Sequence, residues 1–377
     1  MDAGAPDRAG PEDDALAVAP PRGRAAAAAE ALARSGEPGG LLRDAWYFAN
    51  PTATLARGAM RPATIAGEPL LFCRAADGIA FALRDICPHR AIPLRHGKFD
   101  GNEVECCYHG WRFDRTGACT AVPSLVEGQH LNLARINCGR YPVHEAQGCV
   151  WVFVGADADG VPPPRLPDVA NGRARLVLTS DFPCNVDHAV VGLMDPAHGP
   201  FVHKSWWWRP GGTAHAKAKR FGPVEQGFAM LRHRPSSNSL AYRLLGGVPE
   251  TEIAFRLPGI RTEHVVAGRH EVLSLTCVTP VDAQRTVVYQ MLWWTPRLLT
   301  LLKPMIAGFA RAFVDQDRRV VVLQQEGLMH DPPLMLVNDA DTQARWYYRL
   351  KRDWARARAE GRPFVNPVPE TILRWTS

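Results

Sequence analysis

The sequence lacks the features of a secreted or membrane-spanning protein. It does not open on a basic stretch followed by an apolar one, so we expect no secretory signal. Its most apolar long segment, residues 297–314, is interrupted by Lys303 and Arg311 and would cross a bilayer poorly. We therefore expect a cytoplasmic protein.

A strong excess of one charge is also missing. The formal net charge is +6, from 44 basic and 38 acidic residues that are spread along the chain. This balance suits an acidic protein partner and argues against nucleic acid. In a cytoplasmic chain, the nine cysteines are typical of thiols and metal ligands rather than of a disulfide framework.

No aromatic residue occurs before Trp46. The stretch before it is rich in Ala, Gly, Pro, Arg and Asp and cannot bury a core of its own. We expect residues 1–41 to be a disordered extension, in which "AAAAAEALAR" is at most transiently helical. A transit peptide is the alternative, but the acidic "PEDDAL" argues against it.

The chain of 377 residues is long enough for two domains. Residues 64–85 alternate short apolar runs with turn residues and predict three strands, and residues 148–155 predict another. Residues 156–168 are rich in Pro and Asp and predict a linker. A mostly β domain is therefore expected at 42–155.

The second domain, expected at 169–377, mixes both kinds of element, so the predicted fold class is α+β. Residues 270–280 and 285–295 have the β-branched and aromatic residues of strands. Residues 185–198 and 308–328 have helical spacing.

Four candidate metal ligands occur as two pairs in the first domain. They form Cys-x-His and Cys-x-x-His motifs, each just after an apolar run: Cys87, His89, Cys106 and His109. Two thiolates and two imidazoles suit a structural zinc ion, or a 2Fe-2S cluster with the thiolates on one iron and the imidazoles on the other. The spacing alone leaves both possibilities open.

The sequence around these ligands, "CPHRAIPLRHGKFDGNEVECCYHGWRFDRTGACTAVPS", resembles the Rieske domain of the ring-hydroxylating oxygenases along its whole length. The resemblance implies that the four ligands hold a Rieske 2Fe-2S cluster. Because two imidazoles replace two thiolates, such a cluster has a higher reduction potential than an all-cysteine cluster.

The other cysteines have no ligand role in this interpretation. Cys107 stands where the family usually has proline, and the disulfide that joins the cluster loops of respiratory Rieske proteins has no matching partners here. Tyr108 is a candidate hydrogen-bond donor to a cluster sulfur, with packing in the core as the alternative. We expect the remaining thiols to be buried as small hydrophobic groups: Cys73, Cys107, Cys119, Cys138, Cys149, Cys184 and Cys277.

A second group of candidate ligands lies in "CNVDHAVVGLMDPAHGPFVH" at 184–203. Asp195 and His198 are three residues apart and are expected on one helix face. His203 can share a metal with His198 only if the helix ends or distorts near the Gly-Pro pair between them. Two imidazoles and a carboxylate are typical of non-haem iron(II) oxygenases, although histidines also occur at helix ends without any metal.

This stretch again resembles the Rieske oxygenases, now their catalytic domain. The resemblance implies that His198 and His203 bind a mononuclear Fe(II) and that Asp195 is the catalytic bridge between a cluster histidine and an iron histidine. The third iron ligand would be Asp317 in "FVDQDRRVVVLQQ", with Asp315 as an alternative that the helical phase points elsewhere.

Two positions near these ligands differ from many family members. Gln316 stands where many have Glu. Gly192 stands where many have an Asn near the iron, which is expected to open the site to a bulkier substrate.

The resemblance also implies an architecture and an assembly. The Rieske domain would be followed by a catalytic domain with the helix-grip (START-like) fold, an antiparallel sheet around a long helix. Head-to-tail contacts that close into a ring would form a homotrimer, in which Asp195 connects His89 or His109 of one subunit to His198 of the next.

The implied activity is that of a terminal oxygenase, which uses O2 for hydroxylation or oxidative demethylation. Nothing in the chain resembles a flavin or nicotinamide site, so electrons must come from a separate NAD(P)H reductase and possibly a ferredoxin. No charged residue is obvious in the strands at 270–280 and 285–295, which with the loop after "KSWWWRP" are the expected pocket walls. A small apolar substrate is therefore favoured: an aromatic ring, an aromatic ether or a polycycle such as a sterol.

Two other functions remain as alternatives. One is an electron-transfer protein without oxygenase chemistry, and the four residues of the second site argue against it. The other is a zinc-stabilised module that binds a ligand in a helix-grip pocket. A colourless zinc protein would be easily distinguished from a brown one with the EPR signature of a Rieske centre.

Overall fold

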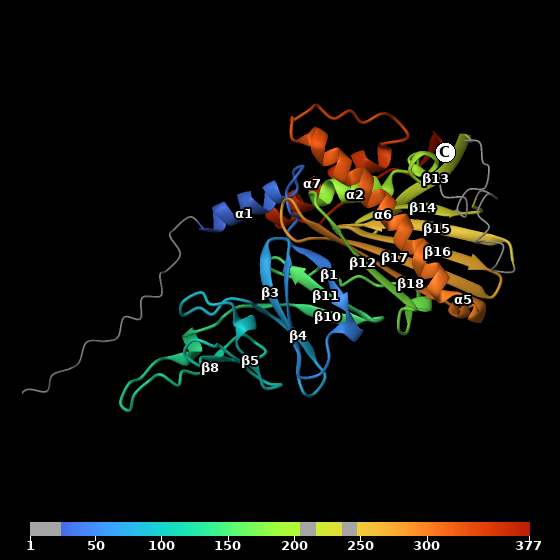
Figure 1. The fold of residues 1–377 in the computed structure, drawn as a ribbon. Coiled ribbons are helices and arrows are strands. Elements are labelled where there is room, and N and C mark those ends of the chain that lie inside the picture. Colours follow the sequence, from blue (N-terminus) through green and yellow to red (C-terminus); the bar gives the residue numbers. More distant parts are fainter. Residues whose placement is uncertain (1–23, 204–215, 236–246) are drawn as a thin grey trace, which may run out of the picture.

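The computed structural model describes residues 24–203, 216–235 and 247–377, which form an α+β fold in two parts (Figure 1). The small antiparallel sheets of the N-terminal part lie on one side of a large antiparallel sheet, and long helices cover the other side of that sheet. The predicted fold class is confirmed. Trp206, Trp207, Trp208 and His215 lie outside the described residues, as do residues 1–23.

The described N-terminal part contains three small sheets. The first has the order β1-β11-β10 and the second the order β2-β3-β4-β9, with bounds Ala45–Pro51 (β1), Cys149–Val154 (β11), Val143–Ala146 (β10), Met60–Ile65 (β2), Glu68–Arg74 (β3), Ala80–Arg84 (β4) and Arg140–Tyr141 (β9). The third consists of Lys98–Phe99 (β5), Val104–Glu105 (β6), Arg112–Phe113 (β7) and Cys119–Ala121 (β8). The strands predicted within 64–85 and 148–155 are all present.

The large sheet has eight described strands in the order β12-β18-β17-β16-β15-β14-β13-β19. Their bounds are Leu176–Phe182 (β12), Ala216–Val224 (β13), Gly227–His233 (β14), Pro249–Arg256 (β15), Ile260–Ala267 (β16), His270–Pro280 (β17), Thr286–Trp294 (β18) and Thr371–Thr376 (β19). Strands β17 and β18 agree with the strands predicted at 270–280 and 285–295. Phe48 of β1 packs against Tyr289 of β18 with ring centroids 4.9 Å apart, so the N-terminal part contacts this sheet directly.

The opposite face of the large sheet is covered by helices. They are Val186–Met194 (α2), Gly199–Val202 (α3), Arg297–Leu301 (α5), Lys303–Leu328 (α6) and Thr342–Ala359 (α7). The buried residues of α6 are Val314, Asp317 and Val321, which recur at helical spacing on one face. A carboxylate therefore lies in the stripe that this long helix turns toward the sheet.

The prediction of disorder over residues 1–41 is wrong for residues 24–41. Arg24–Ser35 forms helix α1, which packs against α7. The approach is so close at Gly36 that a Cβ there would lie 2.6 Å from the Cβ of Ala355. The stretch has no core of its own, as expected, but α7 supplies one.

Residues 156–167 form no helix or strand, although Val161 and Leu166 are buried in the main core. On this basis we propose 42–155 and 169–377 as the two domains, joined by a linker at 156–168. Within the described residues, no helix is both long and apolar enough to span a membrane.

Candidate metal centres

The two loops that carry the candidate cluster ligands have the same backbone pattern. In the first, the Cys87 N–H donates to the Ile92 carbonyl and the Ala91 N–H donates to the Cys87 carbonyl. In the second, the Cys106 N–H donates to the Trp111 carbonyl and the Gly110 N–H donates to the Cys106 carbonyl. Ala91 and Gly110 both have positive φ, at 58° and 71°. Gly adopts this conformation without cost, whereas Ala is strained there.

These loops bring the four candidate ligands together as two pairs. Cys87 and Cys106 are both almost fully buried, and their thiols interact with each other. The rings of His89 and His109 lie 4.7 Å apart between centroids. Burial is the main factor that raises the pKa of Cys87 to about 11 in the metal-free chain. A bound cation would hold this sulfur as a thiolate at neutral pH.

The residues fit a diiron cluster better than a zinc ion. The Nδ1 atom of His109 is buried and has no hydrogen-bond partner among the described residues, as expected for a nitrogen that faces a metal. A tetrahedral zinc site needs all four ligand atoms around one point. Among the described residues, no three of these four bring their ligand atoms within 4.8 Å of one another. A thiol pair beside an imidazole pair instead matches the ligand division of a Rieske cluster.

The other thiols agree with the prediction except at one position. Six are buried: Cys73, Cys119, Cys138, Cys149, Cys184 and Cys277. Cys107 is exposed, so its predicted burial is wrong. It follows the candidate ligand Cys106, whose side chain is buried, and at this loop position the Cys107 side chain turns outward. Tyr108 is also 52% exposed, and its hydroxyl lies 3.5 Å from Arg90 Nη1.

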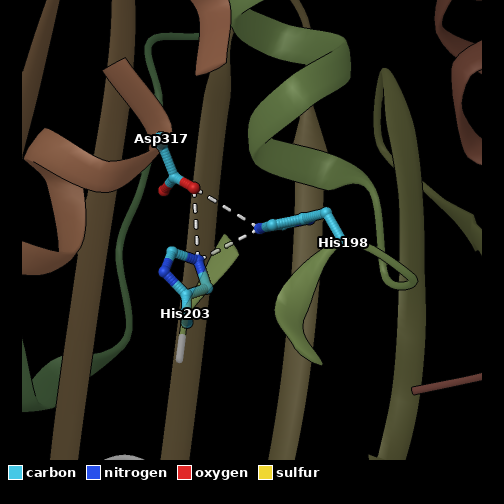
Figure 2. A group of neighbouring side chains, drawn as sticks. All are labelled: His198, His203 and Asp317. Carbon is cyan, nitrogen blue, oxygen red and sulfur yellow. Dashed lines mark hydrogen bonds and ion pairs between the residues drawn. The ribbon is translucent and has the colours of Figure 1, made fainter. Parts of the chain in front are cut away.

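The second group of ligands converges on one point. Figure 2 shows His198, His203 and Asp317 pointing toward one another. The Nε2 atoms of the two histidines are 3.1 Å apart, and Asp317 Oδ1 lies 3.4 Å from His198 Nε2 and 3.2 Å from His203 Nε2. Ligands about 2.1 Å from one metal ion are about 3.0 Å apart at right angles and about 3.4 Å apart in a tetrahedron. The three atoms are thus spaced for a single metal ion.

The electrostatics of this triad suit a cation. Burial acts to raise the pKa of Asp317, but the hydrogen bonds from both histidines outweigh it and leave this pKa below its ordinary value. Burial acts to lower the pKa of His198, but Asp317 and Asp195 outweigh it and leave this pKa raised. In the metal-free chain the triad therefore favours a bound proton, whose place a metal cation can take.

Both histidines have their second ring nitrogen occupied. His198 Nδ1 lies 2.6 Å from the backbone oxygen of Asp195, and His203 Nδ1 lies 2.9 Å from Gln316 Oε1. The ring of Phe313 stacks on the ring of His203, with 3.6 Å between the ring centroids. Acceptors at Nδ1 fix the tautomer that leaves Nε2 free to bind a metal. The sequence showed only that Gln316 replaces Glu, not that it orients His203.

The prediction that Asp195 and His198 share a helix face is wrong. Helix α2 ends at Met194, and Asp195 is its C-terminal cap. Pro196 follows, and a residue before proline disfavours the helical conformation. The chain therefore breaks here, before the Gly-Pro pair at 199–200 where the break was expected. The Asp195 carboxylate accepts the Ala197 N–H at 2.7 Å and lies 3.7 Å from His198 Nδ1.

The structure brings Asp317, and not Asp315, to the two histidines. Asp317 is 8% exposed, whereas Asp315 lies on the exposed side of α6. Val321 lies on α6 one turn beyond Asp317, and a Cβ at Gly192 of α2 would make an ordinary contact of 3.7 Å with it. The residue that departs from the family pattern thus lies against the helix that carries Asp317.

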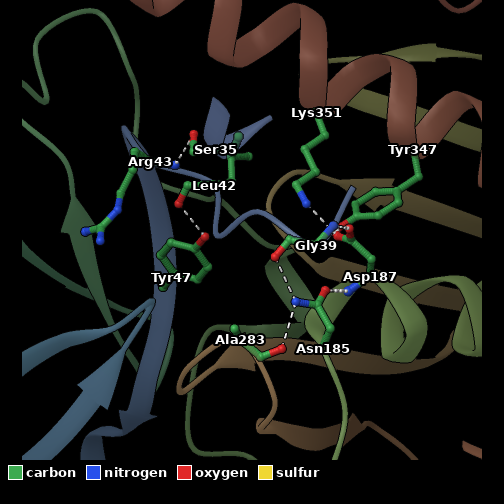
Figure 3. A network of polar contacts seen from close by, with 10 residues as sticks. All are labelled: Ser35, Gly39, Leu42, Arg43, Tyr47, Asn185, Asp187, Ala283, Tyr347 and Lys351. Carbon is green, nitrogen blue, oxygen red and sulfur yellow. Dashed lines mark hydrogen bonds and ion pairs between the residues drawn. The ribbon is translucent and has the colours of Figure 1, made fainter. Parts of the chain in front are cut away.

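A buried ionic network at the start of α2 was not predicted from the sequence (Figure 3). The Asp187 carboxylate accepts hydrogen bonds from the Gly39 N–H at 2.7 Å, the Tyr347 hydroxyl at 2.6 Å and Lys351 Nζ at 2.7 Å. Asn185 caps the helix by accepting the Asp187 N–H. Burial is the main factor that lowers the pKa of Lys351. The network ties α7 and the segment after α1 to the helix that leads into Asp195.

Comparisons with known proteins agree with both centres. A model of the Rieske [2Fe-2S] domain matches residues 45–138, and a model of the vanillate O-demethylase oxygenase C-terminal domain matches residues 182–357. The chain belongs to the Rieske non-haem iron oxygenase family. The predicted membership is therefore confirmed, and the two matched regions contain both groups of candidate ligands.

Individual relatives share part of their length with this Rieske oxygenase chain. The 5,5'-dehydrodivanillate O-demethylase oxygenase subunit of Sphingobium sp. is 31% identical over 215 residues, which are 53% of this chain and 49% of that protein. The chloroplastic chlorophyllide a oxygenase of Chlamydomonas reinhardtii is 35% identical over 172 residues, which are 45% of this chain and 25% of that protein. The chain thus spans about half or less of these curated relatives.

Solved structures show the same fold. A mutant of NdmA from Pseudomonas putida CBB5, solved with theobromine, superposes with a TM-score of 0.69 at 19% identity. The superposition covers 87% of this chain and 93% of that chain.

Proposed function

We propose that this chain is a terminal oxygenase component. In the proposal, electrons pass through a Rieske 2Fe-2S cluster held by Cys87, His89, Cys106 and His109 to a mononuclear Fe(II) held by His198, His203 and Asp317, where O2 is used to hydroxylate or oxidatively demethylate a small substrate. The supporting observation is the His-His-Asp triad, in which His203 and Asp317 are buried and His198 is partly buried, in a chain that contains a Rieske domain. Three protein ligands leave open positions for O2 beside a substrate.

The residues of the chain have separate tasks in this mechanism. Gln316 and the Asp195 carbonyl hold the histidine rings so that both Nε2 atoms face the metal position. Phe313 covers one face of His203, which is only 2% exposed, and thereby keeps water from that side of the triad. The bound iron supplies the redox chemistry with O2. Asp317 neutralises part of the metal charge.

We further propose that the chain works as a homotrimer with Asp195 as the bridge between subunits. The candidate cluster ligands lie in the loops between β4 and β5 and between β6 and β7. Strands β5 and β8 lie at the end of the molecule away from α2 and α6, which supports a wide separation of the two centres of one chain (Figure 1). The Asp195 side chain is 31% exposed and lies beside His198, so a partner histidine can reach it. Phe201, six residues further along the chain, is 69% exposed, which suits an interface with a second copy.

A separate NAD(P)H reductase, possibly with a ferredoxin, would supply the electrons. His89 and its neighbour Arg90 are exposed at the cluster loop, which suits contact with an acidic donor. A curated relative is named as an oxygenase subunit, which implies further components in that system.

The substrate is proposed to be a small aromatic or polycyclic molecule with a largely apolar body. The matched C-terminal domain model and the Sphingobium relative both carry the name of O-demethylases, and the algal relative is named for chlorophyllide a. These names support oxidation of a ring system or of its methoxy group.

Metal analysis tests this function. Purified protein should contain about three iron atoms per chain and show the EPR signal of a reduced Rieske centre. Asp317→Ala should lose the mononuclear iron and all turnover but keep the cluster signal, because the ligand shell loses its only carboxylate. Asp315→Ala is the matched control and should retain both. Unchanged iron content in Asp317→Ala would refute the ligand assignment.

A further inference from the structure

The helix-covered face of the large sheet carries a polar patch. In an antiparallel sheet, residues directly opposite one another point to the same face, so the register fixes which side chains lie together. Arg261 on β16 lies opposite Thr276 on β17, and Thr276 lies opposite Gln290 on β18. Two residues along, Glu263 lies opposite Ser274. We call these five residues the β16–β18 polar patch.

Apolar residues border the patch on both sides. On the β15 side, Phe255 and Ile253 lie opposite its two charged residues. On the β12 side, Leu178 lies opposite Gln290, and Leu176 lies in the next row. The patch is therefore an island in an apolar surface. An arrangement of this kind favours a ligand with an apolar body and one polar substituent.

The patch lies close to the His-His-Asp triad. Ala310 of α6 packs against the cluster of residues that contains Leu178, and Asp317 is seven residues further along this helix, or about 10 Å. On the sheet, Asp181 is three residues beyond Leu178, again about 10 Å, and its carbonyl accepts a hydrogen bond from Arg318 Nε. Strands of the sheet also run behind the triad in Figure 2. The Leu178 border of the patch is thus on the order of 10 Å from the triad, and Arg261 lies three strand spacings beyond Leu178, or about 14 Å. A substituted ring and the long Arg261 side chain together can span the distance between Arg261 and the triad.

Four of the five polar side chains of the patch remain accessible, and Thr276 is buried. The side chains of Arg261 and Glu263 are 24% and 25% exposed, and Ser274 and Gln290 are half-buried. Val278, on the same face of β17, is only 5% exposed. These side chains thus keep solvent-accessible surface on a sheet whose strands β12 and β17 pack against α6 and α2.

The patch has hydrogen-bonding capacity that the described chain does not use. Arg261 Nη2 donates to Glu263 Oε2 at 3.2 Å, and within the described ranges this is the only hydrogen bond that the Arg261 side chain makes. A guanidinium has five N–H donors. Gln290 Nε2 is 3.5 Å from Ser274 Oγ, and Gln290 Oε1 is buried and finds no hydrogen-bond partner in the described residues. An unpaired buried acceptor such as Gln290 Oε1 is costly, and the partly exposed Arg261 keeps donors that a ligand can use.

We propose that Arg261 binds an oxygen substituent of the substrate, a carboxylate or a carbonyl, and thereby sets substrate specificity. The ring of the substrate would lie against the apolar border, with its reacting group toward the triad. Gln290 would be a second anchor through its Nε2 donors, whereas its Oε1 can accept only from a substituent that carries an N–H or O–H. This inference rests on the proposed function. It narrows the substrate class, because a plain hydrocarbon would leave the donors of Arg261 without an acceptor.

Equilibrium binding to the iron-loaded protein under argon tests the inference without turnover. The probes are 3-methoxybenzoate, which carries a carboxylate, 3-methoxybenzamide, which carries a neutral carbonyl, and anisole, which has neither group. The acid or the amide should bind at least about 10-fold more tightly than anisole. Arg261→Met should remove most of this preference. Arg269→Met, in the exposed turn between β16 and β17, is the matched control and should retain it.

Gln290→Leu provides a second variant if Arg261→Met does not fold, and it should weaken binding of the preferred probe several-fold. The inference is overturned if anisole binds as tightly as the others, if neither the acid nor the amide binds, or if Arg261→Met behaves like Arg269→Met. Iron content and the EPR signal are measured on the same samples. Protein without iron at the triad would contradict the proposed function, whereas loaded protein without discrimination contradicts only this inference.

Discussion

Replacing Asp187 by alanine should destabilise the protein strongly and should also disturb the iron site. Asp187 and Lys351 are 3% and 1% exposed at their side chains, so the substitution leaves a buried ammonium group without its counter-ion. Removing one partner of a buried ion pair costs about 3–5 kcal/mol. The Tyr347 hydroxyl and the Gly39 N–H lose an acceptor as well, so we expect a loss in the upper half of this range.

Urea unfolding followed by circular dichroism measures this loss, and iron analysis of the same samples measures the effect on the triad. The control is the double variant Asp187→Leu with Lys351→Met, in which no unpaired charge remains. It should be clearly more stable than Asp187→Ala, because apolar pairs of similar volume often replace a buried ion pair at little cost. A loss below about 1 kcal/mol in Asp187→Ala, or a double variant no more stable than the single one, would refute this reasoning.

Three further substitutions test single steps of the argument. Asp195→Asn keeps an acceptor for the Ala197 N–H but removes the charge, so both metals should be retained while the single-turnover rate falls at least about 10-fold; equal rates would remove the bridging role. Gln316→Leu removes the acceptor at His203 Nδ1 and should weaken iron binding about 10-fold or more in a chelator titration, whereas Gln324→Leu on the exposed side of α6 should not. Burial acts to raise the pKa of Glu145, but the hydrogen-bonded Arg74 outweighs it and leaves this pKa lowered. The stabilising effect of the ionised Glu145 carboxylate is therefore complete above about pH 4.5 and is lost as the pH falls through the folded-state pKa. Glu145→Gln should flatten the acid limb of a plot of unfolding free energy against pH.

The sequence was sufficient for the parts of the protein that short-range patterns determine. The turn residues at 66–67 and 75–79 separate three apolar runs, and these runs form β2, β3 and β4. The helical spacing at 308–328 is that of α6, and its phase separates Asp317 from Asp315. These predictions succeeded because side-chain direction within one element follows from its period alone.

The features that the sequence did not reveal depend on partners far away in the chain. Helix α1 is stable only against α7, some 300 residues later, so its composition alone suggested disorder. Arg261 and Glu263 belong to a strand that was not among the expected pocket walls, and only the register places them beside Ser274 and Thr276. The prediction considered charge only in the strands at 270–280 and 285–295, and it therefore missed the polar patch.

The break between α2 and α3 shows how one local rule shapes the candidate iron site. Two histidines five residues apart on a continuous helix are separated by about 500° of rotation and about 7.5 Å of rise, so their rings diverge. Pro196 ends the first helix at Met194, and α3 begins afresh at Gly199. His198 then sits before the new helix and His203 after it, and both rings turn to the same side. The same break exposes the Asp195 carbonyl, which no longer bonds within a helix and is the acceptor that orients His198. A single proline thus frees the backbone group that fixes one ligand and creates the turn that brings in the other.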